Sequence, residues 1–202
     1  MNDFHEQDGH LLNDGAYTVY DFNVSMNLQE TGYYCGPATV QAVLSYHGIY
    51  FSQSNLAGQL NTSTKTGTEY ADVARVVNKH VFGNSYPGPN DPGYRAVLWT
   101  KGSGGSSTRN TFESRVIRDM KTKDPVFVAI DLKTVYPALP KANHLVLITG
   151  CTVDNNTGKI TYYTINDPYG GSQPYTNNGR KKVYADTLWE AINYNSEPGY
   201  VW

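Results

Sequence analysis

The chain has 202 residues, a length typical of a single domain that buries its own core without disulfides or metals. Its formal net charge is −2 and its lysines and arginines are scattered, which argues against nucleic acid or anionic lipid as a partner. No apolar run approaches the roughly 18–20 residues of a membrane-spanning helix, so we expect no membrane insertion.

The N-terminal residues are polar. Residues 1–15 predict a flexible tail, and residues 16–202 predict one domain. The first residues lack the apolar core of a signal peptide. The abundance of tyrosine and glycine and the low charged fraction of 17% nevertheless favour a secreted or cell-surface bacterial protein.

Helices are predicted in the first half of the chain. An extended segment over residues 17–28 leads to a helix over residues 36–47. A short helix follows over residues 52–60, with a serine as its N-cap. Thr-Gly-Thr-Glu at residues 66–69 resembles a capping box that opens a third helix.

The middle of the chain is rich in turn-forming residues. Residues 82–93 carry Pro, Gly, Asn and Asp and cannot continue a helix, so a turn region is predicted there before a short strand at 94–100. The Gly/Ser stretch 102–107 predicts a flexible loop. Apolar residues at helical spacing predict a helix over 112–120.

Strands dominate the second half. Residues 154–159 form a hairpin turn signal, and the basic run 180–182 is interpreted as a solvated turn before a strand. Helices segregated from an antiparallel sheet indicate an α+β fold. Strands are predicted at 126–132, 144–153, 160–165 and 182–184, followed by a helix around 188–192.

Cys35 lies at the mouth of the first predicted helix, with Pro37 in its first turn. Unpaired N–H groups and the helix dipole favour negative charge there, which lowers a thiol's pKa. Cys151 lies in an apolar run and is interpreted as a small core residue. We therefore expect two free thiols, of which Cys35 is the candidate nucleophile.

A cysteine nucleophile needs a base within hydrogen-bonding reach. His47 lies twelve residues along the helix of Cys35, roughly 18 Å away, which excludes it. His144 opens a predicted strand after a polar segment and is the best candidate. The remaining histidines lie in the polar tail or close a helix: His5, His10 and His80.

The predicted hairpin supplies a group that orients this base. If Asp154 and Lys159 close the turn, Val146 lies opposite Asp167, and paired residues point to the same face. His144 shares that face by alternation, so it becomes a diagonal neighbour of Asp167. A register shifted by one residue would substitute Asn166.

Gln29 lies six residues before Cys35. A side-chain amide beside the cysteine's own N–H can form an oxyanion hole. No residues recur at metal-ligand spacing, and the loop at 102–107 lacks the ending of a phosphate-binding loop, so neither a metal nor a cofactor is expected.

Gln29, Cys35-Gly-Pro-Ala, Asn143-His144 and Asn166-Asp167-Pro together resemble the papain-like cysteine peptidases. The closest branch is the bacteriocin-processing (double-glycine leader) peptidases and their stand-alone relatives. The resemblance covers roughly residues 17–195 and implies the papain-like fold. It also implies Cys35 as nucleophile, His144 as base and acid, Asp167 as orienter and Gln29 as oxyanion donor.

The resemblance implies a peptide or protein substrate and leaves three alternatives open. These are acyl transfer, hydrolysis of cell-wall peptide or isopeptide bonds on the same residues, and a binding module without activity. Exporter-linked members of the branch also carry membrane and ATPase domains, which these 202 residues do not include. Cleavage of double-glycine leaders is therefore not implied, and the oligomeric state stays open.

Overall fold

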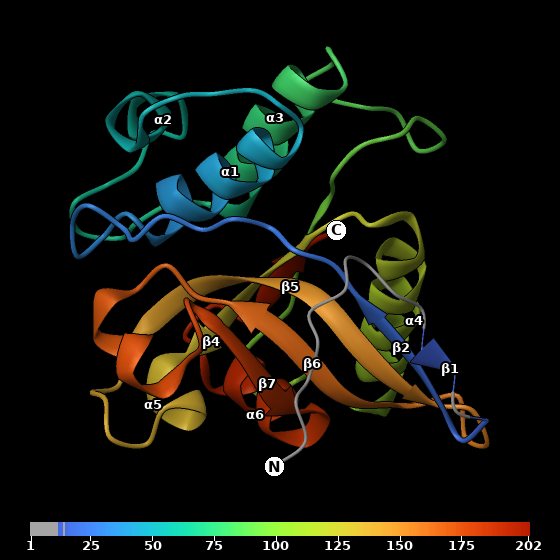
Figure 1. The fold of residues 1–202 in the computed structure, drawn as a ribbon. Coiled ribbons are helices and arrows are strands. Elements are labelled where there is room, and N and C mark those ends of the chain that lie inside the picture. The colour runs from blue at the N-terminus through green and yellow to red at the C-terminus, as the bar shows by residue number, and fades with distance from the viewer. Residues whose placement is uncertain (1–11, 14) are drawn as a thin grey trace.

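The computed structural model describes residues 12–13 and 15–202, which form a helical layer against a sheet (Figure 1). The helical layer holds α1 (Cys35–Tyr46), α2 (Gln53–Gln59) and α3 (Tyr70–Val81). Buried apolar residues from both layers form one core. The predicted α+β class, with helices of the N-terminal half packed on an antiparallel sheet, is confirmed.

The sheet is antiparallel in every pairing, and the long strand β5 organises it. One edge of β5 pairs with β4 and then β2, and its other edge pairs with β6, which continues to β7. The strands are β1 (Leu12–Asn13), β2 (Tyr17–Asp21), β3 (Ala96–Leu98), β4 (Val126–Asp131), β5 (Asn143–Asp154), β6 (Ile160–Asn166), β7 (Arg180–Tyr184) and β8 (Gly199–Val201).

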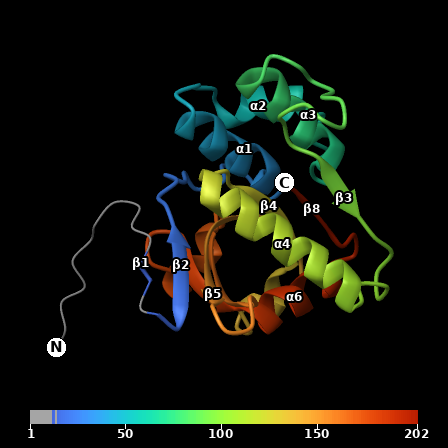
Figure 2. The ribbon, with the colours of Figure 1, turned by 90° about the vertical axis from the view of Figure 1, so that its right-hand side faces the viewer.

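Further helices cover the sheet. Figure 2 shows α4 (Ser106–Thr122) running across the molecule, with α6 (Ala185–Tyr194) below it. A short α5 (Leu132–Val135) and a 3-10 helix, η1 (Gly170–Tyr175), complete the fold. The sequence pattern did not predict these two turns, because each is too short to show a helical period.

Local signals predicted several elements correctly. Ser52 caps α2, since its side chain accepts a hydrogen bond from the Asn55 N–H at 3.2 Å. The turn after β5 closes with the Asp154 N–H donating to the Lys159 carbonyl at 2.9 Å. Both motifs depend only on neighbouring residues, which explains why the sequence was sufficient.

Three predictions were wrong. The predicted capping box does not form, because Glu69 is the N-cap of α3 and makes no side-chain cap. The basic run 180–182 lies inside β7, where pairing with β6 overrides the turn interpretation. The end of the predicted Gly/Ser loop, Ser106 and Ser107, belongs to α4. The tail over residues 1–15 stays a prediction, since residues 1–11 and 14 lie outside the described part; Leu12 and Asn13 pair with β2.

The register of β5 and β6 follows the prediction where it matters for the site. Leu147 pairs with Asn166 and Ile148 with Ile165, as a turn closed by residues 154 and 159 requires. Between these pairs and the turn, two irregularities shift the register by one residue and back. The shifts cancel, so the site end of the hairpin keeps the predicted pairing.

Among the described residues, we find no helix with the length and apolar character needed to cross a bilayer.

Candidate active site

Cys35 is the first residue of α1, and α1 packs on β5. Burial raises the pKa of the Cys35 thiol, whereas the hydrogen bond and charge of His144 and the backbone N–H groups of Leu145 and Gly36 lower it. The net pKa lies below the ordinary value of 9.0. The helix start thus presents a thiol that ionises readily beside a histidine.

His144 is the second residue of β5 and is 7% exposed. Its Nε2 lies 2.7 Å from Oδ1 of Asp167, a carboxylate that is fully buried. Burial alone would lower the pKa of His144, but the charge and hydrogen bond of Asp167, with those of Cys35, raise it to about 10. Since Asp167 occupies Nε2, the ring's Nδ1 is the nitrogen left for the thiol.

The sequence left Asp167 and Asn166 as alternative partners of His144, and the structure separates them. Asn166 accepts a hydrogen bond from Thr149 Oγ1 at 2.9 Å and donates to the Val24 carbonyl at 2.6 Å. Its amide therefore braces the extended segment before Gln29. Of these two residues, Asp167 is the one whose side chain contacts His144.

Two tyrosines near Asp167 escaped the sequence reasoning. The Tyr169 N–H donates to Asp167 Oδ1 at 2.8 Å, and its ring meets the His144 ring edge-on, with centroids 6.0 Å apart. Tyr136 is 2% exposed, and its hydroxyl helps to lower the pKa of Asp167. Burial raises the pKa of Asp167, but the charge and hydrogen bond of His144, with the Tyr169 N–H, outweigh it, so the carboxylate stays ionised.

Gln29 follows the extended segment and is tied to the Asp167 region, because its N–H donates to the Pro168 carbonyl at 2.8 Å. Its side-chain Nε2 donates to the Thr31 carbonyl at 2.8 Å. A carbonyl can only accept, so this bond sets the amide orientation. One Nε2 hydrogen then stays available to another acceptor.

Gln53 holds the backbone on both sides of Gln29. Its Nε2 donates to the Leu28 carbonyl at 2.8 Å, and its Oε1 accepts from the Glu30 N–H at 2.9 Å. Gln41 contacts the same amide at 3.3 Å. No sequence signal marked Gln53, because a glutamine after an N-cap serine is ordinary in a surface helix.

The other described histidines are placed away from this chemistry. His47 is the C-cap of α1, at the opposite end from Cys35. His80 Nε2 lies 2.7 Å from Gln59 Oε1, and burial lowers the pKa of His80. His5 and His10 lie outside the described residues.

Both cysteines are free thiols, as the sequence predicted. Cys151 is buried, and burial raises its pKa to about 12, so it is a poor nucleophile. Over residues 12–13 and 15–202, no three His, Cys, Asp or Glu side chains cluster as a metal site would require.

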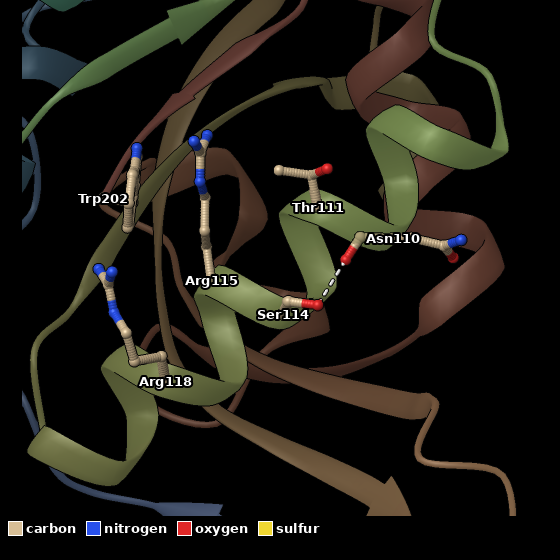
Figure 3. A pocket seen from close by; sticks show the side chains of 6 residues that line it. All are labelled: Asn110, Thr111, Ser114, Arg115, Arg118 and Trp202. Atoms are coloured by element: carbon tan, nitrogen blue, oxygen red, sulfur yellow. Dashed lines mark hydrogen bonds between the residues drawn. The ribbon is translucent and has the colours of Figure 1, made fainter.

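A separate hollow of about 460 Å³ lies along α4 (Figure 3). The guanidinium groups of Arg115 and Arg118 lie over the Trp202 ring at 4.0 and 4.1 Å. Arg115 also donates to the Tyr200 hydroxyl at 2.7 Å. Neither a thiol nor an imidazole lines this hollow, so it is separate from the pair formed by Cys35 and His144.

A helix that starts at a thiol and packs on an antiparallel strand with a histidine as its second residue is the arrangement of the papain-like class of fold. Many solved structures share this fold. The peptidase domain of Streptococcus ComA, a bi-functional ABC transporter involved in quorum sensing, is 12% identical. It aligns with a TM-score of 0.52 over 89% of this chain and 97% of that chain.

A double glycine motif protease from an AMS/PCAT transporter, solved with its leader peptide, is 14% identical, with a TM-score of 0.52 over 90% and 91% of the two chains. Bromelain from Ananas comosus, solved with the E64 inhibitor, is 17% identical, with a TM-score of 0.51 over 88% and 92%. No curated protein sequence matches the chain. The model of the Peptidase_C39 like family matches residues 22–197, and the protein belongs to that family.

Proposed function

We propose that this protein is a cysteine peptidase in which Cys35 is the nucleophile, His144 the general base and acid, Asp167 the group that orients His144, and Gln29 an oxyanion donor. The observation that carries the proposal is the buried 2.7 Å contact between His144 and Asp167 beside a thiol of lowered pKa. Family membership supports the same chemistry.

The reaction would proceed in two stages. The Cys35 thiolate attacks the peptide carbonyl carbon, and the oxyanion accepts hydrogen bonds from the Cys35 N–H and Gln29 Nε2. The imidazolium of His144 gives its proton to the leaving amine as the C–N bond breaks, which leaves a thioester. Water then gives a proton to His144 and attacks the thioester, which releases the acid and restores the Cys35 thiolate beside the His144 imidazolium.

Substitution of Cys35 tests this proposal. Cys35→Ala and Cys35→Ser should abolish cleavage of a proteome-derived peptide library, read by mass spectrometry, while circular dichroism stays unchanged. Full activity in Cys35→Ala would refute the mechanism. Products that incorporate an added amine would instead favour acyl transfer, and a Cys35 inert to iodoacetamide near neutral pH would favour a binding module.

A further inference from the structure

Two segments border the pair formed by Cys35 and His144, one from each layer. The first precedes α3 in the helical layer. Gly36, next to the nucleophile, packs so closely against Thr68 that an added Cβ would lie 2.6 Å from the Thr68 Cβ. Glu69 follows Thr68 in the chain, so its side chain starts one residue away from the contact between Gly36 and Thr68.

The second segment precedes β8 in the sheet layer. The Ser196 N–H donates to Asn143 Oδ1 at 3.1 Å, and the Asn143 amide donates back to the Ser196 hydroxyl. Asn195 fixes the segment to strand β4, since its amide donates to the Ile130 carbonyl at 2.9 Å. Because Asn143 directly precedes His144, these bonds hold Glu197 near the histidine.

The two segments meet at Tyr70. Its hydroxyl donates to the Glu197 carbonyl at 2.5 Å and so bridges the helical layer and the sheet. Burial, with the charges of Glu197, Cys35 and Glu69, raises the pKa of Tyr70. One hydroxyl therefore lies within electrostatic range of the thiol and of both carboxylates.

Both carboxylates are exposed. Within the described part of the chain, neither Glu69 nor Glu197 forms a salt bridge. Without an ion-pair partner in that part of the chain, their charges give this border of the site a negative potential.

We propose that Glu69 and Glu197 select substrates with a lysine or arginine side chain within three residues of the scissile bond. An extended peptide rises roughly 3.3 Å per residue, so such a side chain can reach the border while the scissile carbonyl lies at Cys35. Its alkyl stem can cover the Tyr70 region while its cationic end meets the carboxylates. This inference deepens the proposed peptidase function and rests on it.

The potential can be measured without peptide cleavage. Charged methanethiosulfonates react when the Cys35 thiolate attacks the sulfenyl sulfur, forms a mixed disulfide and releases methanesulfinate. The rate with the trimethylammonium-ethyl reagent, divided by that with the sulfonato-ethyl reagent, reports the field at the thiol. In E69Q/E197Q we expect this ratio to fall roughly tenfold at low salt, since each exposed charge contributes a modest amount. Glu190→Gln on α6 is the matched control and should leave the ratio unchanged.

Peptide cleavage then tests selectivity. With wild type, Lys and Arg should be enriched within three positions of the cleavage sites in the library, and E69Q/E197Q should lose that enrichment. Raising the salt concentration should weaken it, because exposed charges are screened. An unchanged reagent ratio in E69Q/E197Q, or cleavage without cationic enrichment, would overturn the inference. Normal reagent ratios with no cleavage of any peptide would instead refute the proposed function and with it the substrate class.

Discussion

Gln53 should control activity through Gln29, although it lies on α2 and contacts no reacting atom. Its side-chain amide holds the Leu28 carbonyl at 2.8 Å and the Glu30 N–H at 2.9 Å, on either side of Gln29. It is 1% exposed, so water cannot easily replace those bonds. We predict that Gln53→Ala displaces Gln29 from the oxyanion position.

The structure sets the size of the effect. Two hydrogen bonds at about 1 kcal/mol each give a loss of roughly 2 kcal/mol in the free energy of unfolding. If the same energy positions Gln29, the rate falls about 30-fold, since 1.36 kcal/mol corresponds to a factor of ten. The upper limit is the loss of an oxyanion donor, about 100–1,000-fold. Because this interaction forms in the transition state, kcat should fall while KM stays constant.

A double-mutant cycle separates positioning from general destabilisation. The kcat/KM of wild type, Gln29→Ala, Gln53→Ala and the double variant would be measured with one peptide from the library. If Gln53 acts through Gln29, the double variant should be no slower than Gln29→Ala. Gln59→Ala on the same helix is the matched control and should keep full activity.

Two results would refute this reasoning. One is a Gln53→Ala protein with wild-type kcat/KM. The other is a double variant whose losses multiply, because independent effects would mean that Gln53 does not act through Gln29. Iodoacetamide alkylation of Cys35 should keep its rate in every variant, since none of them changes the thiol or His144.

Three further predictions follow from the site. Alkylation of Cys35 should stay fast well below pH 9.0. In His144→Ala the pH midpoint of this alkylation should move above 9.0, because burial raises the pKa of Cys35 and His144 no longer opposes it. An unchanged midpoint would contradict the pairing of Cys35 with His144. In the Cys35→Ala background, the raised pKa of His144 contributes stability that is present below the ordinary value of 6.5 and is lost as pH rises through the folded-state pKa. Urea unfolding should show this fall, and Asp167→Asn should flatten it. Gly36→Ala should destabilise the fold by about 1–3 kcal/mol because its Cβ meets Thr68, and Thr68→Gly should restore part of that loss in thermal unfolding.

Local patterns predicted the parts of the site that depend on neighbouring residues. The helix from Cys35 shows an apolar period, and Ser52 caps the next helix as expected. The hairpin turn set the register that brings Asp167 to His144. The prediction succeeded even though two irregularities shift the pairing, because they cancel before the site.

The sequence by itself determined that a thiol lies at a helix start and that His144 opens a strand, since helix and strand periods and turn signals are local properties. Only the tertiary structure decided between Asp167 and Asn166, because one amide turns to the Val24 carbonyl while the carboxylate turns to the histidine. It also placed Gln53 beside the backbone that flanks Gln29, and the Tyr70 hydroxyl against the Glu197 carbonyl. These contacts join residues far apart in the chain, so they form only when the helical layer packs on the sheet.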